Sequence, residues 1–316
     1  MLTLPVHSFL PKNLNVTLHQ QPTAMKWYQK YLSIYGKALS DIPDGTILQI
    51  RNQLQSLQSD DPEVSVVVIA HNEGQRLLAC LWSLSELQSQ WRLEIMGVNN
   101  QSDDNTEELF RLTGLPYHNE ERKSPGFARQ CGLVHSRGRY HFFIDADTMY
   151  PPYYIDLLME KLSAPAKNGQ PETVAVGSLW SYYPDANHSA WGLHLFEFIR
   201  DCFLFVQHFK RPELCIRGMV FAFRADYARK EQIRTDIRRG EDGSLALSLK
   251  KYGRIQFVYN RQARPVTGYG TLGNESLFKS LLYRIRYQLR GISRIFFKTN
   301  HYEDRDDNLI NPRTQT

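Results

Sequence analysis

The 316-residue sequence has few cysteines, no uninterrupted apolar run and little excess of charge of either sign. Its cysteines form no CxxC pair and no other metal-ligand spacing, which excludes a disulfide-dense secreted domain and a cysteine-held metal. We therefore expect separate thiols in a reducing compartment. The four cysteines are Cys80, Cys131, Cys202 and Cys215.

Targeting and membrane-spanning signals are also missing. The first residues, MLTLPVHSFLPKN, contain two prolines and lack a compact apolar core with a cleavage site. The most apolar stretch, 190–209, is interrupted by histidine and by charged side chains, whereas a spanning helix needs about 20 mostly apolar residues. We expect a soluble cytoplasmic protein.

What the sequence contains is typical of a folded globular protein. Hydrophobic residues make up 42% of the chain and charged residues 22%, which excludes a disordered or collagen-like chain. The net charge at neutral pH is only +5. This mild positive charge permits an anionic ligand or a membrane surface, and it gives no reason to expect nucleic acid as a partner.

The chain divides into three parts by composition. Residues 1–61 are polar, and we identify one periodic aromatic segment there, 25–39, which predicts a helical extension packed on a larger domain. From residue 62 short apolar runs alternate with amphipathic stretches, which predicts a mostly parallel sheet flanked by helices. The expected strands are 64–70, 93–98, 115–118 and 140–144, and the expected helices are 75–87, 104–112 (capped by Ser102 or Asp103), a helix from Ser124–Pro125 to Gly138, and 244–252.

Polar residues follow these strands where a ligand of a parallel sheet would bind, beyond the carboxyl ends. His71-Asn72-Glu73 follows the first strand, 99–106 the second, and Asp145-Ala146-Asp147 the fourth. Alternate residues of an extended segment point the same way, so Asp145 and Asp147 can hold a hard divalent cation between them. The alternative is that one aspartate caps the next helix and the other is solvated.

Two later segments carry further candidates. Glu241 and Asp242 form a second carboxylate pair; they are either functional acids or acids placed to favour the dipole of the following helix. The segment 215–224 predicts a strand in which Gly218 marks a close approach to the backbone.

Six motifs in order make the sequence resemble the inverting family 2 nucleotide-sugar glycosyltransferases of GT-A fold. They are VSVVVIAHNEG, N-N-x-S-D-D-x-T, GFARQCG with Gly138, FFIDADT, RGMVFAFR and GED, and the resemblance covers about residues 62–268. It implies a Rossmann-like, mostly parallel sheet flanked by helices.

The resemblance also implies a nucleotide-sugar site. Asn100 matches the position that contacts uracil, although Asp is commoner there, and Arg129 either meets a phosphate or lies on the helix surface. Glu73 is expected to accept a hydrogen bond from the ribose or base. The full set of expected donor-binding residues is Ala70, His71, Asn72, Glu73, Asn100, Ser102, Gly126, Ala128, Arg129, Asp145, Ala146, Arg217 and Gly218.

For catalysis, the resemblance implies that Asp145 and Asp147 hold Mn²⁺ or Mg²⁺ on the donor diphosphate. Asp242 matches the catalytic base, and the assignment between it and its neighbour Glu241 stays open. The implied reaction moves a sugar from a nucleoside diphosphate, most often UDP, to a hydroxyl of a saccharide or lipid-linked saccharide. The alternatives are a degenerate sugar-nucleotide-binding scaffold, a phosphatase or phosphotransferase with a DxDxT loop, and a nucleotidyltransferase.

The last part, 269–316, combines a basic amphipathic pattern with a polar tail. Apolar residues recur every three or four positions over 276–298, interleaved with six basic residues and no acid. This pattern favours peripheral contact with an anionic membrane at its inner face. A helix docked on the catalytic domain is the other interpretation.

Overall fold

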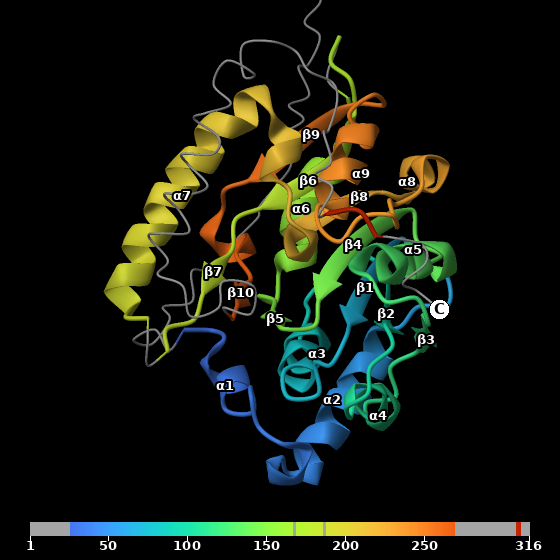
Figure 1. Cartoon of the computed structure of the whole chain (residues 1–316), viewed down its shortest axis with the longest axis vertical. Coiled ribbons are helices and arrows are strands. Elements are labelled where there is room, and N and C mark those ends of the chain that lie inside the picture. The colour runs from blue at the N-terminus through green and yellow to red at the C-terminus, as the bar shows by residue number, and fades with distance from the viewer. Residues whose placement is uncertain (1–25, 167–168, 186–187, 269–307, 311–316) are drawn as a thin grey trace, which may run out of the picture.

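The computed structural model describes residues 26–166, 169–185, 188–268 and 308–310. The N-terminal residues and the basic pattern at 276–298 lie outside the described residues. Within them, a central sheet is covered on both faces by helices, and a long helix runs along one side of the molecule (Figure 1).

Seven strands form the central sheet, in the order β3-β2-β1-β4-β8-β6-β9. The first four strands in the sequence are parallel to one another, and Val64 of the first is aligned with both Leu93 and Tyr140. The strand β8 is antiparallel to its neighbours β4 and β6. The predicted mostly parallel sheet is therefore confirmed. The strands are β1 (Val64–Ala70), β2 (Leu93–Asn99), β3 (Tyr117–Asn119), β4 (Tyr140–Asp145), β6 (Thr173–Ser178), β8 (Phe221–Arg224) and β9 (Arg254–Val258).

Alternation along β1 divides the core between the two faces of the sheet. Val66 and Val68 pack with the helices of one face, whereas Val67 packs with Ala128 of α5 on the other. The helix α5 begins as expected, because the Ser124 hydroxyl accepts from the Phe127 N–H and Pro125 is the first helical residue. The helices against the sheet are α2 (Asp44–Leu57), α3 (Leu77–Ser85), α4 (Thr106–Leu112), α5 (Pro125–His135), α6 (Tyr154–Leu162), α8 (Ala225–Glu231) and α9 (Glu241–Leu249).

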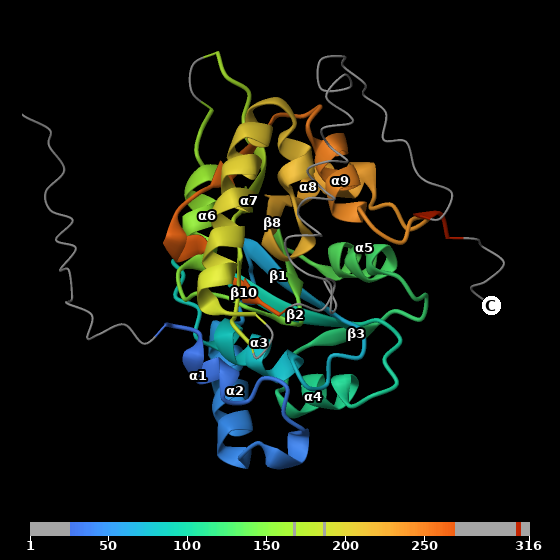
Figure 2. The ribbon, with the colours of Figure 1, turned by 60° about the vertical axis from the view of Figure 1, so that its left-hand side comes forward.

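A small second sheet and a long helix extend this core. The small sheet has the order β5-β10-β7, from β5 (Thr148–Met149), β7 (Ser181–Tyr182) and β10 (Val266–Thr267). The helix α7 (Ala190–Lys210) lies on the outside of the molecule (Figure 2). Among the described residues no helix combines the length and the apolar character needed to cross a membrane. Short 3-10 turns complete the structure: η1 (Leu39–Asp41), η2 (Pro212–Cys215), η3 (Gly218–Val220) and η4 (Arg261–Ala263).

The N-terminal part differs from the expected helix at 25–39. Only α1 (Gln29–Leu32) is helical there, and Gly36 adopts φ +77°, which ends any continuation. The aromatic residues still pack on the larger domain, since Tyr28 and Tyr31 are buried in its core. The following helix α2 was not predicted, although Ile50 and Leu54 are its buried positions.

Three local predictions are also corrected. The first residue before α4 is Asn105, and neither Ser102 nor Asp103 caps this helix. The N-cap Asn105 makes no side-chain cap bond, and Asp104 just before it accepts from the Thr106 N–H through its Oδ1 at 2.9 Å. The helix expected at 244–252 begins three residues earlier, at Glu241. In the segment 215–224 only Phe221–Arg224 is a strand.

Candidate active site

The loops that follow β1 and β2 are tied together by hydrogen bonds. The Asn72 N–H donates to the Ser102 hydroxyl at 3.1 Å, and Asn72 Oδ1 accepts from the Asp103 N–H at 2.9 Å. The Glu73 N–H donates to Thr106 Oγ1 at 2.8 Å. Asn72 has φ 55°, a left-handed conformation that these bonds hold in place. The two loops therefore form one rigid edge beside the ends of the strands.

His71 and Asn100 are fixed within this edge. His71 Nδ1 donates to the Asn100 carbonyl at 2.7 Å. The Asn100 Nδ2 faces two carbonyls, of Glu120 at 3.1 Å and of Arg122 at 2.8 Å. Carbonyls only accept hydrogen bonds, so the orientation of the amide is fixed and its Oδ1 points the other way. The Oδ1 of Asn100 is thus left to act as an acceptor.

Asp145 and Asp147 lie at the end of β4, where the sequence predicted them, and Glu73 adds a third carboxyl group. Burial, followed by the charge of Asp145, raises the pKa of Asp147. Burial and then Asp147 raise the pKa of Glu73 to about 8, against the opposing effect of Arg76, whose Nε is 2.6 Å from Glu73 Oε2. Burial and mutual repulsion at this edge of the sheet therefore favour the neutral forms of Glu73 and Asp147.

Arg129 is buried beneath these acids and is no surface arginine. Its Nη2 donates to Asp145 Oδ1 at 2.8 Å and its Nε to Glu241 Oε1 at 3.1 Å, with 4% of the side chain exposed. Although burial opposes its charge, the two carboxylates raise the pKa of Arg129. The arginine therefore joins the end of β4 to the start of α9, which are distant in sequence.

Glycines make room for this arrangement. A Cβ on Gly218 would lie 1.9 Å from Arg129 Nη2, which confirms the close approach expected at this glycine. A Cβ on Gly126 would lie 2.3 Å from the Arg234 carbonyl. Ala128 is buried in the core between α5 and the sheet. Arg217, next to Gly218, donates to the Leu214 carbonyl at 3.1 Å. The small residues Gly126 and Ala128 therefore let the helix that carries Arg129 pack closely against its neighbours.

The two acids of α9 have different surroundings. Glu241 is buried, and burial together with Asp242 raises its pKa. Asp242 is partly exposed, and its Oδ1 accepts from the Gly243 N–H at 2.7 Å. Both lie in the first turn, where the helix dipole favours negative charge. Asp242 is therefore the more exposed of the two acids, while Glu241 is engaged by Arg129.

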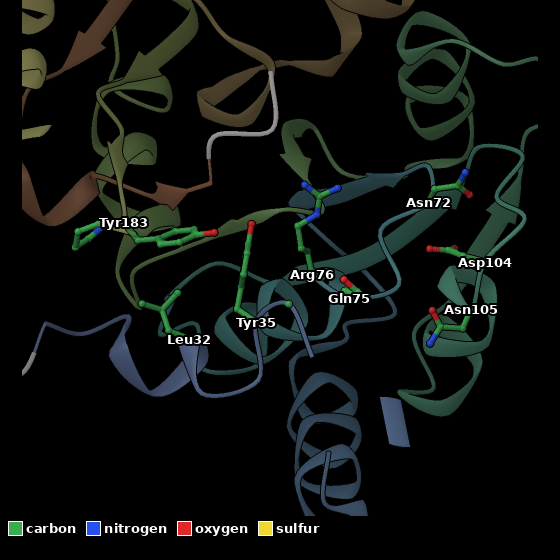
Figure 3. A pocket seen from close by; sticks show the side chains of 10 residues that line it. Leu32, Tyr35, Asn72, Gln75, Arg76, Asp104, Asn105 and Tyr183 are labelled. Carbon is green, nitrogen blue, oxygen red and sulfur yellow. The ribbon is translucent and has the colours of Figure 1, made fainter. Parts of the chain in front are cut away.

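A pocket of about 640 Å³ is lined by residues of the N-terminal part, by the loops after β1 and β2, and by the residues that follow β7. Tyr35 and Tyr183 direct their hydroxyls toward one another next to Arg76, while Asn72 and Asp104 line the opposite side (Figure 3). Tyr35 also donates to the Asp147 carbonyl at 3.0 Å. Sequence reasoning did not identify Tyr35, Arg76 or Tyr183 as site residues, because none belongs to a recognisable motif. The aromatic pattern at 25–39 indicated only that Tyr35 packs on the domain.

The carboxylates suit a hard cation, although they do not enclose one by themselves. No group of three or more His, Cys, Asp or Glu side chains in the described part of the chain is arranged to hold a metal. Burial first, and then the charge of Asp145, raises the pKa of Asp147, and a divalent cation between the two carboxylates would offset their repulsion. These two residues therefore fit a metal that receives its other ligands from a bound substrate.

The sheet order and the polar loops at its carboxyl edge define an α/β protein of the GT-A type. Residues 65–231, more than half of the chain, match the family described as Glycosyl transferase family 2, and the chain belongs to this family. The resemblance noted in the sequence is thereby confirmed.

Individual relatives are more distant. The chain is 26% identical to glycosyltransferase GlyA of Streptococcus pneumoniae over 202 residues, 58% of this chain and 27% of GlyA. It is 30% identical to glycosyltransferase AglE of Haloferax volcanii over 93 residues, 27% of this chain and 31% of AglE. The chain thus spans less than a third of either relative. The structure of mannosyltransferase PcManGT from Pyrobaculum calidifontis, in complex with GDP-Man and Mn²⁺, has a TM-score of 0.51 at 18% identity, covers 73% of this chain and 66% of PcManGT, and supports the fold.

Proposed function

We propose that the protein is an inverting glycosyltransferase that moves a sugar from a nucleoside diphosphate donor to a hydroxyl group. The observation that carries this proposal is the Arg129 bridge, which brings Asp145 and the Glu241–Asp242 pair to one place. Glycosyl transfer needs a negative site for the metal diphosphate and a separate base for the acceptor. The bridge sets these two parts beside one another, and family membership supports the same activity.

On the donor side, we assign the tied loops after β1 and β2 to the nucleoside. Asn100 offers an acceptor oxygen, which can pair with the ring N–H that uracil and guanine present. UDP- and GDP-sugars are therefore the proposed donors, and PcManGT, of similar fold, binds GDP-Man. Asp145 and Asp147 would hold Mn²⁺ or Mg²⁺, which offsets the charge that grows on the departing diphosphate.

On the acceptor side, Asp242 is the proposed base. Its carboxylate takes the proton of the acceptor hydroxyl while that oxygen forms a bond to the anomeric carbon. The bond from this carbon to the diphosphate breaks at the same time, with inversion. Arg129 keeps Glu241 in place, and Glu241 in turn sets the first turn of α9, so both are positioning residues. The acceptor, a saccharide or lipid-linked saccharide, and the cytoplasmic location remain predictions.

A donor screen tests the proposal. The full-length protein is incubated with UDP-, GDP-, ADP- and CDP-sugars, with Mn²⁺ or with a chelator, and release of the nucleoside diphosphate is measured. We expect release from a UDP- or GDP-sugar only with the divalent cation. Binding of these nucleotides, measured by thermal shift, without any hydrolysis or transfer in an acceptor panel would favour the scaffold alternative. No binding of any nucleotide would refute the proposal.

A further inference from the structure

The connection between α8 and α9, residues 232–240, forms no helix and no continuous strand, yet distant parts of the chain hold it at both ends. At its start it lies against α5. The Ile233 N–H donates to Gln130 Oε1 at 2.8 Å, and a Cβ on Gly126 would lie 2.3 Å from the Arg234 carbonyl oxygen. At its end it meets residues 308–310, drawn in red in Figure 1. We call 308–310 the anchor segment.

The anchor segment pairs with the connection as a short antiparallel bridge. The bridge joins Ile237, which is fully buried, to Leu309. A backbone hydrogen bond of 2.8 Å lies on each side of it, and one of the two runs from the Arg238 N–H to the Asn308 carbonyl. The backbone of the connection is therefore fixed as far as Arg238.

Asn308 extends this pairing by one residue through its side chain. Its Oδ1 accepts from the Arg239 N–H and its Nδ2 donates to the Arg239 carbonyl, each at 3.0 Å. A side-chain amide can both accept and donate, so here it takes the place of the backbone of a neighbouring strand. Both polar groups of the Arg239 backbone are thus held by one side chain, 69 positions further along the chain.

The residues directly after Arg239 are the start of α9 and its two acids. Gly240 is the N-cap, with φ +90°, and makes no side-chain cap bond. Glycine adopts many backbone conformations, so Gly240 does not by itself determine the direction in which α9 begins. Arg129 holds the side chain of Glu241. The backbone that leads to Asp242 is held from the other side, by Asn308.

We propose that Asn308 is a positioning residue for Asp242. The inference rests on the proposed function, in which Asp242 is the base, and it adds a residue that lies outside the family match at 65–231. A base must lie within about 2.6–3.2 Å of the hydroxyl oxygen from which it takes the proton. If the Arg239 backbone is released, Gly240 can rotate and the first turn of α9 moves, which takes the carboxylate out of this range.

The nucleotide site should be insensitive to the same change. The loops assigned to the nucleoside are tied to one another by their own hydrogen bonds, such as the one from the Asn72 N–H to Ser102 at 3.1 Å. Loss of the Asn308 bonds should therefore lower the rate of transfer and leave nucleotide affinity unchanged. A purely structural role for Asn308 would not separate these two quantities.

Kinetics of the full-length protein test the proposal, with a UDP- or GDP-sugar as donor. Asn308→Ala and Asn308→Leu, of which the second keeps the size of the side chain, should each lower kcat at least about ten-fold. The Kd for UDP or GDP should stay within about two-fold of wild type. Asn260→Ala and Asn260→Leu are matched controls, because Asn260 is also exposed and its side chain accepts from the Gln262 N–H at 2.9 Å, beside η4. We expect both controls to match wild type.

Hydrogen exchange measured by mass spectrometry gives a second readout that needs no transfer. In Asn308→Ala, peptides that cover 236–245 should exchange faster than in wild type, while peptides from β1 and α5 should not change. Unchanged exchange over 236–245 would overturn the proposal.

The kinetic outcomes separate this proposal from the proposed function. An active wild type whose Asn308 variants keep their kcat, or lose nucleotide affinity as much as kcat, would overturn the role of Asn308 alone. Wild type that transfers no sugar from any donor would refute the proposed function, and the role of Asn308 in it, even if exchange over 236–245 responds to the substitution.

Discussion

Arg129 and Asp145 are held 2.8 Å apart with the arginine almost fully buried. A buried arginine is stable only when carboxylates compensate its charge, and here Asp145 and Glu241 share that role. The same guanidinium stacks over Phe143 at 4.5 Å. This ion pair links the proposed metal ligand to the helix of the proposed base, so changes at one should be felt at the other.

Replacing Arg129 with methionine should therefore reduce both stability and activity. The substitution leaves Asp145 and Glu241 without their partner, and we expect unfolding free energy to fall by about 3 kcal/mol, the lower end for a buried pair because Asp145 is 34% exposed. Chemical denaturation measures the loss, with the exposed Arg139→Met as control. Arg129→Met as stable as wild type would show that the pair does not hold the site together.

Gly218→Ala should impair transfer more than folding. The new Cβ would lie 1.9 Å from Arg129 Nη2, so the guanidinium must move away from Asp145. Small displacements of positioning groups can cost about 100-fold in rate, and we expect a loss of this order in kcat/KM. Gly45→Ala is the control, because nothing lies within 4 Å of its added Cβ. Equal activity of the two variants would contradict the proposed role of Gly218.

Asn100→Asp should weaken nucleotide binding. In this chain Nδ2 donates to the carbonyls of Glu120 and Arg122, and a carboxylate oxygen there would repel both. We expect a loss of about 1–3 kcal/mol in stability and weaker UDP or GDP binding by calorimetry. Asn52→Asp, on the exposed side of α2, controls for the added charge. Tighter binding by Asn100→Asp would refute the assigned amide orientation.

Stability should fall on acidification because of His141. Burial, followed by Arg229 and Arg129, lowers the pKa of His141 to about 3. In the unfolded chain its pKa is about 6.5, so between these values the unfolded state binds the extra proton. The contribution is complete above pH 6.5 and is lost toward pH 3, with a slope of up to about 1.4 kcal/mol per pH unit. In denaturation experiments, the unfolding free energy of His141→Phe should depend less steeply on pH, by the binding of one proton. An unchanged slope would show that His141 is not the cause of the acid sensitivity.

The sequence predicts the part of the fold that local patterns determine. Short apolar runs located β1 to β4, helical periodicity located the helices between them, and the Ser124–Pro125 signal placed the start of α5 correctly. The strand order and the antiparallel β8 depend on contacts between distant segments, which no local pattern encodes. The helix α2 was missed because its buried positions, such as Ile50 and Leu54, are separated by polar residues.

The sequence predicted which acidic residues form the site, and it did not predict the contacts that join them. Motifs named Asp145, Asp147 and Asp242, which lie at the ends of the elements expected to carry them. The motifs did not decide whether Arg129 contacts a phosphate or lies on the surface. The structure shows that Arg129 is buried, in space that Gly218 leaves open. Tyr35 and Arg76 reach the pocket from outside the motifs. The ion pair between Asp201 of α7 and Arg264 also could not be predicted, since the two residues lie far apart along the chain.

The most direct test compares Asp242→Asn with wild type for transfer and for nucleotide binding in the presence of Mn²⁺. The amide keeps the size of the side chain and removes its ability to accept the hydroxyl proton. We predict that transfer is abolished while the affinity for the nucleoside diphosphate stays within about two-fold, because Asp145, Asp147 and Arg129 are unchanged. Full transfer activity in Asp242→Asn would contradict the account.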